Sequence, residues 1–467
     1  MLKQDTGNNK KYDAIIIGSG QSGNPLAKDL ASDGWKVAII EKNFVGGSCI
    51  NYGCTPSKTM AASAQTAYFV RESSKYGIHS TSLKINMKEV YQRKKQTVES
   101  FRKGTLKKLK SSDNITLFSG EASFTDPKTI KINTSNKRTI TITSDKIFIN
   151  TGGRPAIPSI EGLDKVSYLD STSIMDLETL PKNLIILGGG YIGVEFGQMF
   201  RRFGSDVSII QRDKQLLNKE DPDIAIEVKK IFEEDGINVF LNSEVKKIEK
   251  KKNTIFLTIK TKGRTKNISG SHLLIAAGHK PNTEQLNLAA AGVKTNERGY
   301  IIVNDKLETN IEGIYALGDV KGGPAFTHIS YDDYRIIRDN ILYNKNKTMK
   351  GRMVPYTVFI DPQLGRVGLN EIQAKEKGID YAVAKMPMSY VARAIEVSQT
   401  RGLMKIIIDK KTEKILGCTI LGIDGGELMS MLQIAMIGNL KYSSLQNAIF
   451  THPTLAESLN NVFTKIQ

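Results

Sequence analysis

The chain has 467 residues, of which 40% are hydrophobic and 24% are charged, as in an ordinary globular protein. At roughly 100–200 residues per domain, this length predicts about three domains and excludes a mainly disordered chain. Only three cysteines are present, which excludes a secreted scaffold stapled by disulfides. Lys and Arg exceed Asp and Glu by 66 − 48 = 18. This excess either favours anionic partners or reflects a lysine-rich composition.

No apolar stretch approaches the roughly 20 residues that span a bilayer, so we expect no membrane partner. The first 13 residues are polar and rich in Lys and Asn, without the apolar core of a signal peptide. The expected location is therefore the cytoplasm.

The first predicted elements are a strand, a glycine turn, a helix and a second strand, and the same series returns near the middle of the chain. The first copy comprises a strand at 14–17, Gly18-Ser-Gly20-Gln-Ser-Gly23, a helix to about 32 and a strand at 35–40. The second copy comprises a strand at 184–187, Gly188-Gly-Gly190-Tyr-Ile-Gly193, a helix to about 203 and a strand at 207–210. Glycines in this context permit a tight turn, close backbone approach to a pyrophosphate, and close packing of helix on strand. Two dinucleotide sites are predicted.

The residue 23 positions after each first glycine predicts which nucleotide each site takes. Glu41 ends the second strand of the first copy, where an acid hydrogen-bonds a free ribose 2′-OH, as in FAD or NAD. The second copy has Gln211 there, followed by Arg212. A neutral residue with a neighbouring guanidinium suits a 2′-phosphate, so we predict NADPH over NADH, unless Arg212 is simply a surface residue.

The remaining segments predict further elements in chain order. Residues 60–112 read as mostly helical and basic, and residues 115–150 and 237–275 as short strands with turns. From about 346 the composition is that of a separate α/β domain, with strands at 404–408 and 415–420.

The segment GGSCINYGCTPSK at 46–58 places Cys49 and Cys54 five positions apart, directly after the first βαβ unit. Paired cysteines in a reducing compartment indicate metal binding or redox chemistry. Four intervening residues are unusual for zinc and no companion Cys/His pair stands elsewhere, so a reversible disulfide is favoured and no metal site is expected. Cys418 lies in an apolar, strand-like run and is expected in the core.

Of the five histidines, His452 stands out because Glu457 follows it five residues later near the chain end. A carboxylate bonded to one ring nitrogen fixes the tautomer and raises the basicity of the other, as general base catalysis requires. The pair is a candidate base.

These motifs resemble those of the flavoprotein disulfide reductases, a family that includes dihydrolipoamide dehydrogenase, glutathione reductase and mercuric reductase. The resemblance covers nearly the whole chain. It also includes Thr151-Gly-Gly-Arg-Pro155, Gly188–Glu195, Ala276-Ala-Gly278, Ala316-Leu-Gly-Asp319 and Thr451-His-Pro-Thr-Leu-Ala-Glu457.

The resemblance implies a role for each catalytic candidate. Cys54 matches the thiol next to the flavin, and Cys49 matches the interchange thiol that meets the substrate. Lys58 and Glu195 match an ion pair near the flavin N5. In the family the His–Glu pair comes from the partner subunit, so the match of His452 and Glu457 implies an obligate homodimer.

The resemblance also implies the residues that line the two cofactor sites. For FAD these are Gly18, Gly20, Gly23, Glu41, Gly47, Ser48, Lys58, Gly120, Ala122, Thr151, Gly152, Asp319 and Thr327, with His328 nearby. For NADPH they are Gly188, Gly190, Gly193, Gln211, Arg212, Val245 and Gly278.

The expected fold class is therefore α/β, with two Rossmann-like domains for FAD and NADPH and a C-terminal α+β dimerisation domain. The expected boundaries are 1–150 for FAD binding, 151–270 for NAD(P)H binding, 271–345 for a central segment that completes the FAD site, and 346–467 for the interface.

The resemblance is closest to mercuric-reductase-like proteins, through GCTPSK and MFRRFG (199–204). It implies an NADPH-linked reductase that passes electrons through FAD and Cys49/Cys54 to a small substrate, either Hg(II) or a thiol-reactive oxidant such as hypothiocyanous acid. The alternatives are a dihydrolipoamide dehydrogenase and a glutathione-type disulfide reductase. A non-enzymatic anion or nucleic-acid binder is a remote alternative. The basic stretches 93–110 and 246–252 hold only Phe101 as an aromatic, so no nucleic-acid partner is expected.

Overall fold

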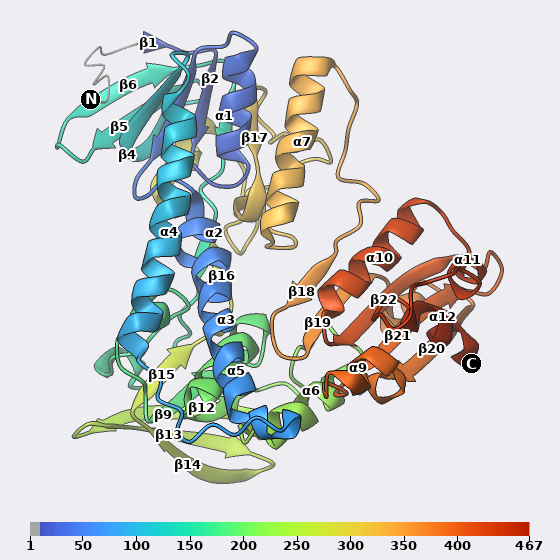
Figure 1. Cartoon of the computed structure of the whole chain (residues 1–467). Coiled ribbons are helices and arrows are strands. Elements are labelled where there is room, and N and C mark those ends of the chain that lie inside the picture. Colours follow the sequence, from blue (N-terminus) through green and yellow to red (C-terminus); the bar gives the residue numbers. More distant parts are fainter. Residues whose placement is uncertain (1–9, 467) are drawn as a thin grey trace. The chain divides into compact units, whose positions relative to one another are not determined.

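The computed structural model describes residues 10–466 (Figure 1). The first nine residues, which belong to the polar start, and residue 467 lie outside the described part. By its internal contacts the chain divides into two units, each assembled from three stretches. Unit 1 takes residues up to 59, 92–156 and 279–352, and unit 2 takes 60–91, 157–278 and 353 onward.

Unit 1 is built on an eight-stranded sheet in the order β1-β6-β5-β4-β3-β2-β7-β17. The strands from β4 to β17 in that order are parallel neighbours, whereas β5 pairs antiparallel with β4 and with β6. The strand bounds are β1 Lys10–Lys11, β2 Ala14–Ile17, β3 Val37–Glu41, β4 Ile115–Asp126, β5 Thr129–Thr134, β6 Thr139–Thr143, β7 Ile147–Ile149 and β17 Ile314–Ala316. The residues of β2 are all buried, as expected of a parallel strand covered on both faces.

Two helices of unit 1 lie side by side, α1 (Gly23–Ser32) and α7 (Thr327–Tyr343) (Figure 1). Helix α1 buries Leu26, Ala27 and Leu30, which share one face at helical spacing. A short antiparallel pair, β8 (Gly153–Pro155) with β16 (His279–Pro281), completes this unit.

The cysteine segment forms two consecutive helices. Helix α2 (Gly47–Tyr52) ends before Gly53, and α3 (Cys54–Arg71) begins at the second cysteine. Helix α4 (Met87–Lys110) follows after a break that contains a short 3₁₀ turn. The expected helical character of 60–112 is confirmed, apart from residues 72, 77–86 and 111–112, which hold no regular element.

Unit 2 contains the second nucleotide fold, a parallel four-stranded sheet in the order β11-β10-β9-β15. Its elements are β9 Asn183–Leu187, α5 Tyr191–Phe203, β10 Asp206–Ile210, α6 Pro222–Glu234, β11 Asn238–Phe240 and β15 His272–Ile275. An antiparallel three-stranded sheet accompanies it, with β12 Ser243–Lys251, β13 Thr254–Thr261 and β14 Arg264–Gly270.

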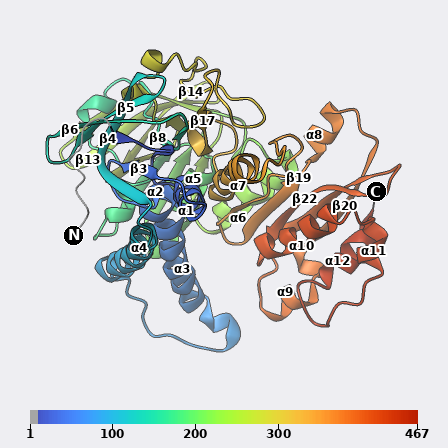
Figure 2. The ribbon, with the colours of Figure 1, turned by 90° about the horizontal axis from the view of Figure 1, so that it is seen from above.

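The last third of the chain forms an antiparallel five-stranded sheet in the order β18-β19-β22-β21-β20. Helix α10 (Gly425–Ile437) packs across β19 and β22 (Figure 2). The other bounds are β18 Tyr356–Val358, β19 Gln363–Gly368, α8 Glu371–Glu376, β20 Tyr381–Pro387, α9 Ala392–Glu396, β21 Leu403–Asp409, β22 Ile415–Gly422, α11 Tyr442–Gln446 and α12 Ser458–Val462.

The expected α/β class and both βαβ units are confirmed. Each predicted strand is present, and its bounds differ from the expected ones by two residues or fewer. Within residues 10–466, no helix is long and apolar enough to cross a membrane.

Candidate functional site

The first glycine turn is shaped by close backbone contacts with the end of β7. Gly18 has φ +101°, and a Cβ there would lie 2.3 Å from the Asn150 carbonyl oxygen. At Gly23 a Cβ would lie 2.4 Å from the Gly18 carbonyl oxygen, and at Gly20 it would lie 2.7 Å from Asn150 Oδ1. Side chains are therefore excluded at all three glycines, as packing of strand, turn and helix requires.

Asn150 is a site residue that the sequence reasoning missed. Its Oδ1 accepts the Gly23 N–H (3.0 Å) and its Nδ2 donates to the Leu317 carbonyl (3.0 Å). It thereby ties the glycine turn to the chain just after β17. The available signal was a polar residue directly after the apolar strand 147–149.

Glu41 occupies the place expected of a ribose-binding acid. Its Oε2 accepts the Ser19 N–H (3.0 Å) and the Ser19 hydroxyl (2.9 Å), and its Oε1 accepts the Asn43 N–H (2.9 Å). The carboxylate is half-buried beside the turn, at the carboxyl end of β3. A carboxylate oxygen accepts more than one hydrogen bond, so this anchored group can still take ribose hydroxyls.

Asp319 supplies a second carboxylate of unit 1 that fits a polyhydroxyl ligand. Burial raises the pKa of this carboxyl group, and the charges of His279 and Lys321 act in the opposite direction. Among the described residues none donates a hydrogen bond to it. Its neighbour Asp333 is instead saturated, by Lys321 (3.2 Å), by Arg352 (2.6 Å) and by the Gly318 N–H (2.8 Å). Asp319 is half-buried, and its carboxylate oxygens can accept hydroxyl groups such as those of the FAD ribityl chain.

The other expected FAD residues lie in unit 1 with packing roles of their own. The Thr151 hydroxyl donates to the Asn282 carbonyl (2.9 Å), and Gly152 has φ +66° with nothing near its Cβ position. Gly120 lies so close to β5 that a Cβ would approach the Asn133 carbonyl oxygen to 2.6 Å, and Ala122 is buried in the core. Contacts of these residues with FAD stay predictions.

The two cysteines lie at the junction of α2 and α3, both as thiols. Cys54 is exposed and its Sγ lies 3.4 Å from the hydroxyl of Thr327, the first residue of α7. Cys49 is half-buried. A hydrogen bond with Cys54 and burial both raise the Cys49 pKa, whereas Thr327 lowers it. The interchange candidate is therefore held as a neutral thiol and needs a base before it attacks a substrate.

The second glycine turn repeats the first one in unit 2. Gly188 has φ +115° and its Cβ would lie 2.3 Å from the Ala276 carbonyl oxygen, while a Cβ at Gly193 would lie 1.9 Å from the Gly188 carbonyl oxygen. Gly190 instead faces open space. The backbone is thus accessible to a pyrophosphate at the start of α5, where unpaired N–H groups and the helix dipole favour an anion.

Gln211 and Glu41 occupy equivalent places, because Gln211 Oε1 accepts the Gly189 N–H (2.9 Å) as Glu41 accepts that of Ser19. Arg212 is 84% exposed and its Nε lies 3.6 Å from Asp213. Asp213 also accepts from Gln211 Nε2 (2.9 Å). The sequence reasoning missed Asp213, although it directly follows Arg212.

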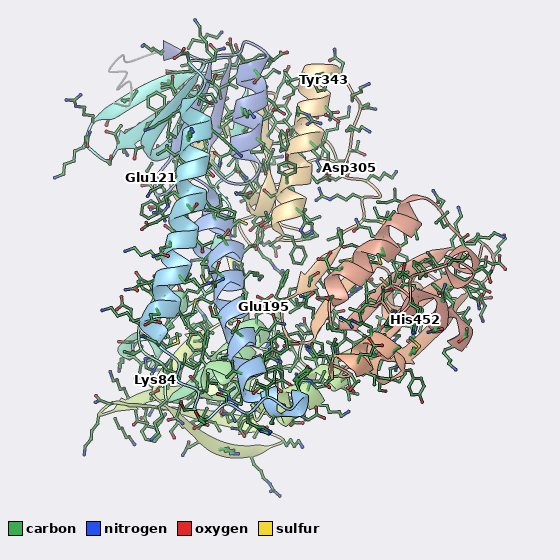
Figure 3. The ribbon with its side chains drawn as sticks, viewed as in Figure 1. Lys84, Glu121, Glu195, Asp305, Tyr343 and His452 are labelled. Carbon is green, nitrogen blue, oxygen red and sulfur yellow. The ribbon has the colours of Figure 1, made fainter. Side chains whose placement is uncertain are left out.

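The remaining nucleotide candidates also lie in unit 2. Val245 is buried in β12, where a register shift against β13 follows it, and Gly278 has φ +133° with open space at its Cβ position. Glu195 lies on α5 (Figure 3), where its Oε1 accepts the Phe359 N–H (2.9 Å). Lys58 belongs to unit 1, and its expected ion pair with Glu195 stays a prediction.

His452, labelled in Figure 3, lies in the loop that precedes α12 and is in direct contact with Glu457. His452 Nδ1 lies 2.9 Å from one carboxylate oxygen of Glu457 and 3.1 Å from the other. The His452 side chain is 68% exposed. Its Nε2 is therefore the ring nitrogen left for proton transfer, with the tautomer set by the carboxylate.

Cys418 and His328 each pack against neighbouring residues. Cys418 is buried in the sheet, as expected, and burial raises its pKa to about 12. His328 stacks on Phe326 with ring centroids 5.4 Å apart. Residues 10–466 contain no group of three or more His, Cys, Asp or Glu side chains that could hold a metal ion.

Comparison with known proteins gives family matches to both parts of the chain. The model of the pyridine nucleotide-disulphide oxidoreductases matches residues 12–333, and that family's dimerisation domain matches residues 354–463. A probable pyridine nucleotide-disulfide oxidoreductase of Escherichia coli K12, RclA, is 39% identical over 98% of this chain and 100% of its own length.

The chain is also similar to relatives that are named for other activities. A mercuric reductase of Lysinibacillus sphaericus is 34% identical over 97% of this chain and 82% of its own length. A dihydrolipoyl dehydrogenase of Geobacillus stearothermophilus is 30% identical over 95% and 94%. The solved structure of the HOCl-induced flavoprotein disulfide reductase RclA from E. coli superimposes with TM-score 0.88 at 38% identity, over 97% of this chain and 99% of that one. The chain belongs to the pyridine nucleotide-disulphide oxidoreductase family.

Proposed function

We propose that this chain is an NADPH-linked flavoprotein reductase that uses a Cys49–Cys54 disulfide to reduce a small, thiol-reactive oxidised substrate. The observation that carries the proposal is the pair of thiols at the α2–α3 junction, in the same unit as a glycine turn and carboxylates that fit FAD. FAD, when bound, supplies a two-electron relay between the nicotinamide and the disulfide. Thiol chemistry of this kind suits a reducing compartment, which favours the cytoplasm.

We assign the binding and proton-transfer roles to residues of this chain. The glycine turns of α1 and α5 bind the two pyrophosphates, while Glu41 and Asp319 take hydroxyl groups of FAD. We assign Lys58 and Glu195 to the neighbourhood of the nicotinamide. The partner subunit's His452, held by its Glu457, removes the proton from Cys49.

The substrate would be a soft electrophile that a thiolate attacks. With hypothiocyanous acid, the Cys49 thiolate bonds to the electrophilic sulfur and releases hydroxide. The Cys54 thiolate then attacks Cys49 Sγ, closes the disulfide and expels thiocyanate. One dithiol loses two electrons and two protons: the substrate becomes thiocyanate and hydroxide, one proton converts the hydroxide to water, and the other is released to solvent. Mercuric ion would take the same two electrons. The relatives named as mercuric reductases and as an HOCl-induced reductase support this class of substrate.

The preference for NADPH rests on the second nucleotide turn. Gln211 is neutral where an acid would repel a 2′-phosphate, and the Arg212 guanidinium is exposed to solvent. The Asp213 carboxylate beside it opposes this preference in part, because it attracts the same guanidinium.

The assembly would be a homodimer. Support comes from the match to the family's dimerisation domain over residues 354–463 and from the exposure of His452, which is available to a second subunit.

The decisive experiment is an anaerobic titration of the purified yellow protein with NADPH. A long-wavelength thiolate–flavin band is expected, and it is expected to vanish in Cys54→Ser. Turnover is then compared for mercuric ion, hypothiocyanous acid, glutathione disulfide, lipoamide and cupric ion. Absence of the band in the parent protein would refute the proposal. Fastest turnover with lipoamide would favour a dihydrolipoamide dehydrogenase, the family of the Geobacillus relative.

A further inference from the structure

We propose that Asn51 and Arg102 are positioning residues that set the redox equilibrium of the cysteine pair. They act through the orientation of helix α2, the short helix that carries Cys49. The inference rests on the proposed function, because it concerns the same dithiol. All of its contacts lie within unit 1.

Asn51 lies between the two cysteines and is almost fully buried, with 7% exposure. Its Nδ2 donates to two backbone carbonyls of the preceding loop, those of Phe44 (3.2 Å) and Val45 (3.0 Å), and to the carbonyl of Gly47 (2.9 Å), the first residue of α2. A single amide therefore fastens α2 to the loop that leads into it. Removing the amide would leave these carbonyls without their side-chain donor, which is costly for buried groups.

Arg102 holds that amide in its working orientation. Its Nε donates to Asn51 Oδ1 at 2.8 Å, and its guanidinium carbon lies 3.7 Å above the centre of the Phe44 ring. Because Oδ1 must face the charged donor, Nδ2 is directed to the carbonyls. Arg102 belongs to α4, which no motif of the sequence connects with the cysteines.

The loop is anchored on its other side to the first glycine turn. Gln21 Nε2 donates to the Gly46 carbonyl (3.0 Å), and the Gly46 N–H donates to the Ser19 carbonyl (2.9 Å). At Gly47, where the loop ends and α2 begins, a Cβ would lie 2.6 Å from the Gly20 Cα, so the two backbones are in contact. The loop is thus held in place by the glycine turn, and Asn51 and Arg102 hold α2 against the loop.

The position of α2 determines how Cys49 meets Cys54. Gly53 separates the two helices with φ −130° and ψ −114°, a conformation outside the helical region, so the angle between α2 and α3 is not set by a continuous helix. A disulfide tolerates only a narrow range of Cα–Cα and Cβ–Cβ distances. Loosening α2 lowers the effective concentration of one thiol at the other and favours the dithiol.

The test compares Arg102→Gln with Lys103→Gln in the FAD-loaded full chain. The control makes the same charge change one residue further along α4, at an exposed side chain. Each protein is equilibrated in glutathione buffers, and the fraction of disulfide is read by thiol trapping. Arg102→Gln is expected to shift the equilibrium about tenfold toward the dithiol, which equals about 30 mV for a two-electron couple. The rate of flavin reduction by NADPH and the FAD content are expected to stay unchanged in both variants.

Asn51→Leu provides a second variant of similar size that keeps neither the donor nor the acceptor, and it should shift the pair in the same direction. Arg102→Gln should add little in the Asn51→Leu background, because leucine at that position offers the guanidinium no acceptor and the contact is already lost. Equal equilibria for Arg102→Gln and Lys103→Gln, or a shift toward the disulfide, would overturn the inference. A parent protein whose cysteines form no disulfide in any buffer would instead overturn the proposed function.

Discussion

Arg212 and Asp213 make opposite contributions at one nucleotide site. The guanidinium is exposed and free to meet a 2′-phosphate, but Asp213 lies 3.6 Å from its Nε. Arg212→Ala should raise the KM for NADPH by about tenfold, the scale of one hydrogen bond between charged groups, and should leave the KM for NADH nearly unchanged. Steady-state kinetics with both nucleotides measure this. Asp213→Asn is the counter-test, since it should lower the KM for NADPH, and an equal effect of Arg212→Ala on both nucleotides would contradict the assignment.

The raised pKa of the Asp319 carboxyl group predicts how the stability of the FAD-free protein depends on pH. Burial raises its pKa in the folded chain. Between the pKa of the unfolded state and the higher pKa of the folded state, the folded protein therefore binds more protons than the unfolded one. Stability therefore falls as pH rises through that window, and the penalty is complete above it. Asp319→Asn should raise the unfolding midpoint of the FAD-free protein at pH 7, with no gain below about pH 3, where the carboxyl is protonated in both states.

The same substitution should act in the opposite direction on the cofactor. An amide is a weaker acceptor for hydroxyl donors than a carboxylate, so Asp319→Asn should release FAD more readily. Thermal unfolding of the FAD-free and FAD-loaded protein measures both effects. A lower midpoint for the FAD-free variant would contradict the reading of Asp319 as a carboxylate awaiting a ligand.

At the residue scale, the sequence predicts side chains that belong to a motif. It misses side chains that lie outside a motif but hold the motif's residues in place. Gly18, Glu41 and Cys49 stand at spacings with a physical meaning, and the structure places each beside the expected turn or helix junction. Asn150 and Arg102 belong to no motif. They matter because distant segments meet there, and sequence spacing carries no information on such contacts.

At the scale of elements, the two βαβ units follow from hydrophobic runs and glycine turns, whereas the cysteine helices do not. A run such as 14–17 is buried on both faces, and its apolar character is therefore continuous. Helix α2 has six residues, too few to show a helical period, and its position depends on the contacts of Asn51. The register shift in β12 is likewise invisible in the sequence.

Helix α10 presents an apolar face that predicts where a second subunit binds. Met431, Ile434 and Ile437 are 42%, 68% and 55% exposed, although the opposite face of the helix is buried against its own sheet. Ile434→Glu should give a monomer, because a buried carboxylate has no partner in a self-complementary interface. If the partner's His452 is the base, turnover should fall about 100-fold or more.

Sedimentation and turnover of the same samples measure this prediction. Ile372→Glu on α8 is the matched control, since Ile372 is an isoleucine with 42% exposure on another element. A dimer that persists in Ile434→Glu, or a fully active monomer, would contradict the assignment.

At the scale of the whole molecule, the order of segments along the chain does not give the composition of the compact units. Unit 1 joins residues up to 59 with 92–156 and 279–352, so β17 completes a sheet that begins at residue 10, and α7 packs beside α1. The expected boundaries at 150, 270 and 345 were drawn from motif positions alone and stay predictions. The strand β17 joins the sheet of unit 1 from far along the chain. In the sequence it is marked only by the short apolar run 314–316, which does not show the sheet to which the strand belongs.

The net charge of +18 is also a property of the whole molecule, and it predicts how fast an anionic nucleotide arrives. A positive field raises the rate of encounter with NADPH, and salt screens this field over about 10 Å at 0.1 M. Raising the salt concentration should therefore lower kcat/KM for NADPH. Flavin reduction at saturating NADPH should not change, because the bound nucleotide no longer depends on the long-range field. NADH lacks the 2′-phosphate and should show a shallower decline. Stopped-flow measurements at several salt concentrations separate the two steps, and a kcat/KM for NADPH that is independent of salt would mean that the excess charge is spread too evenly to steer the nucleotide.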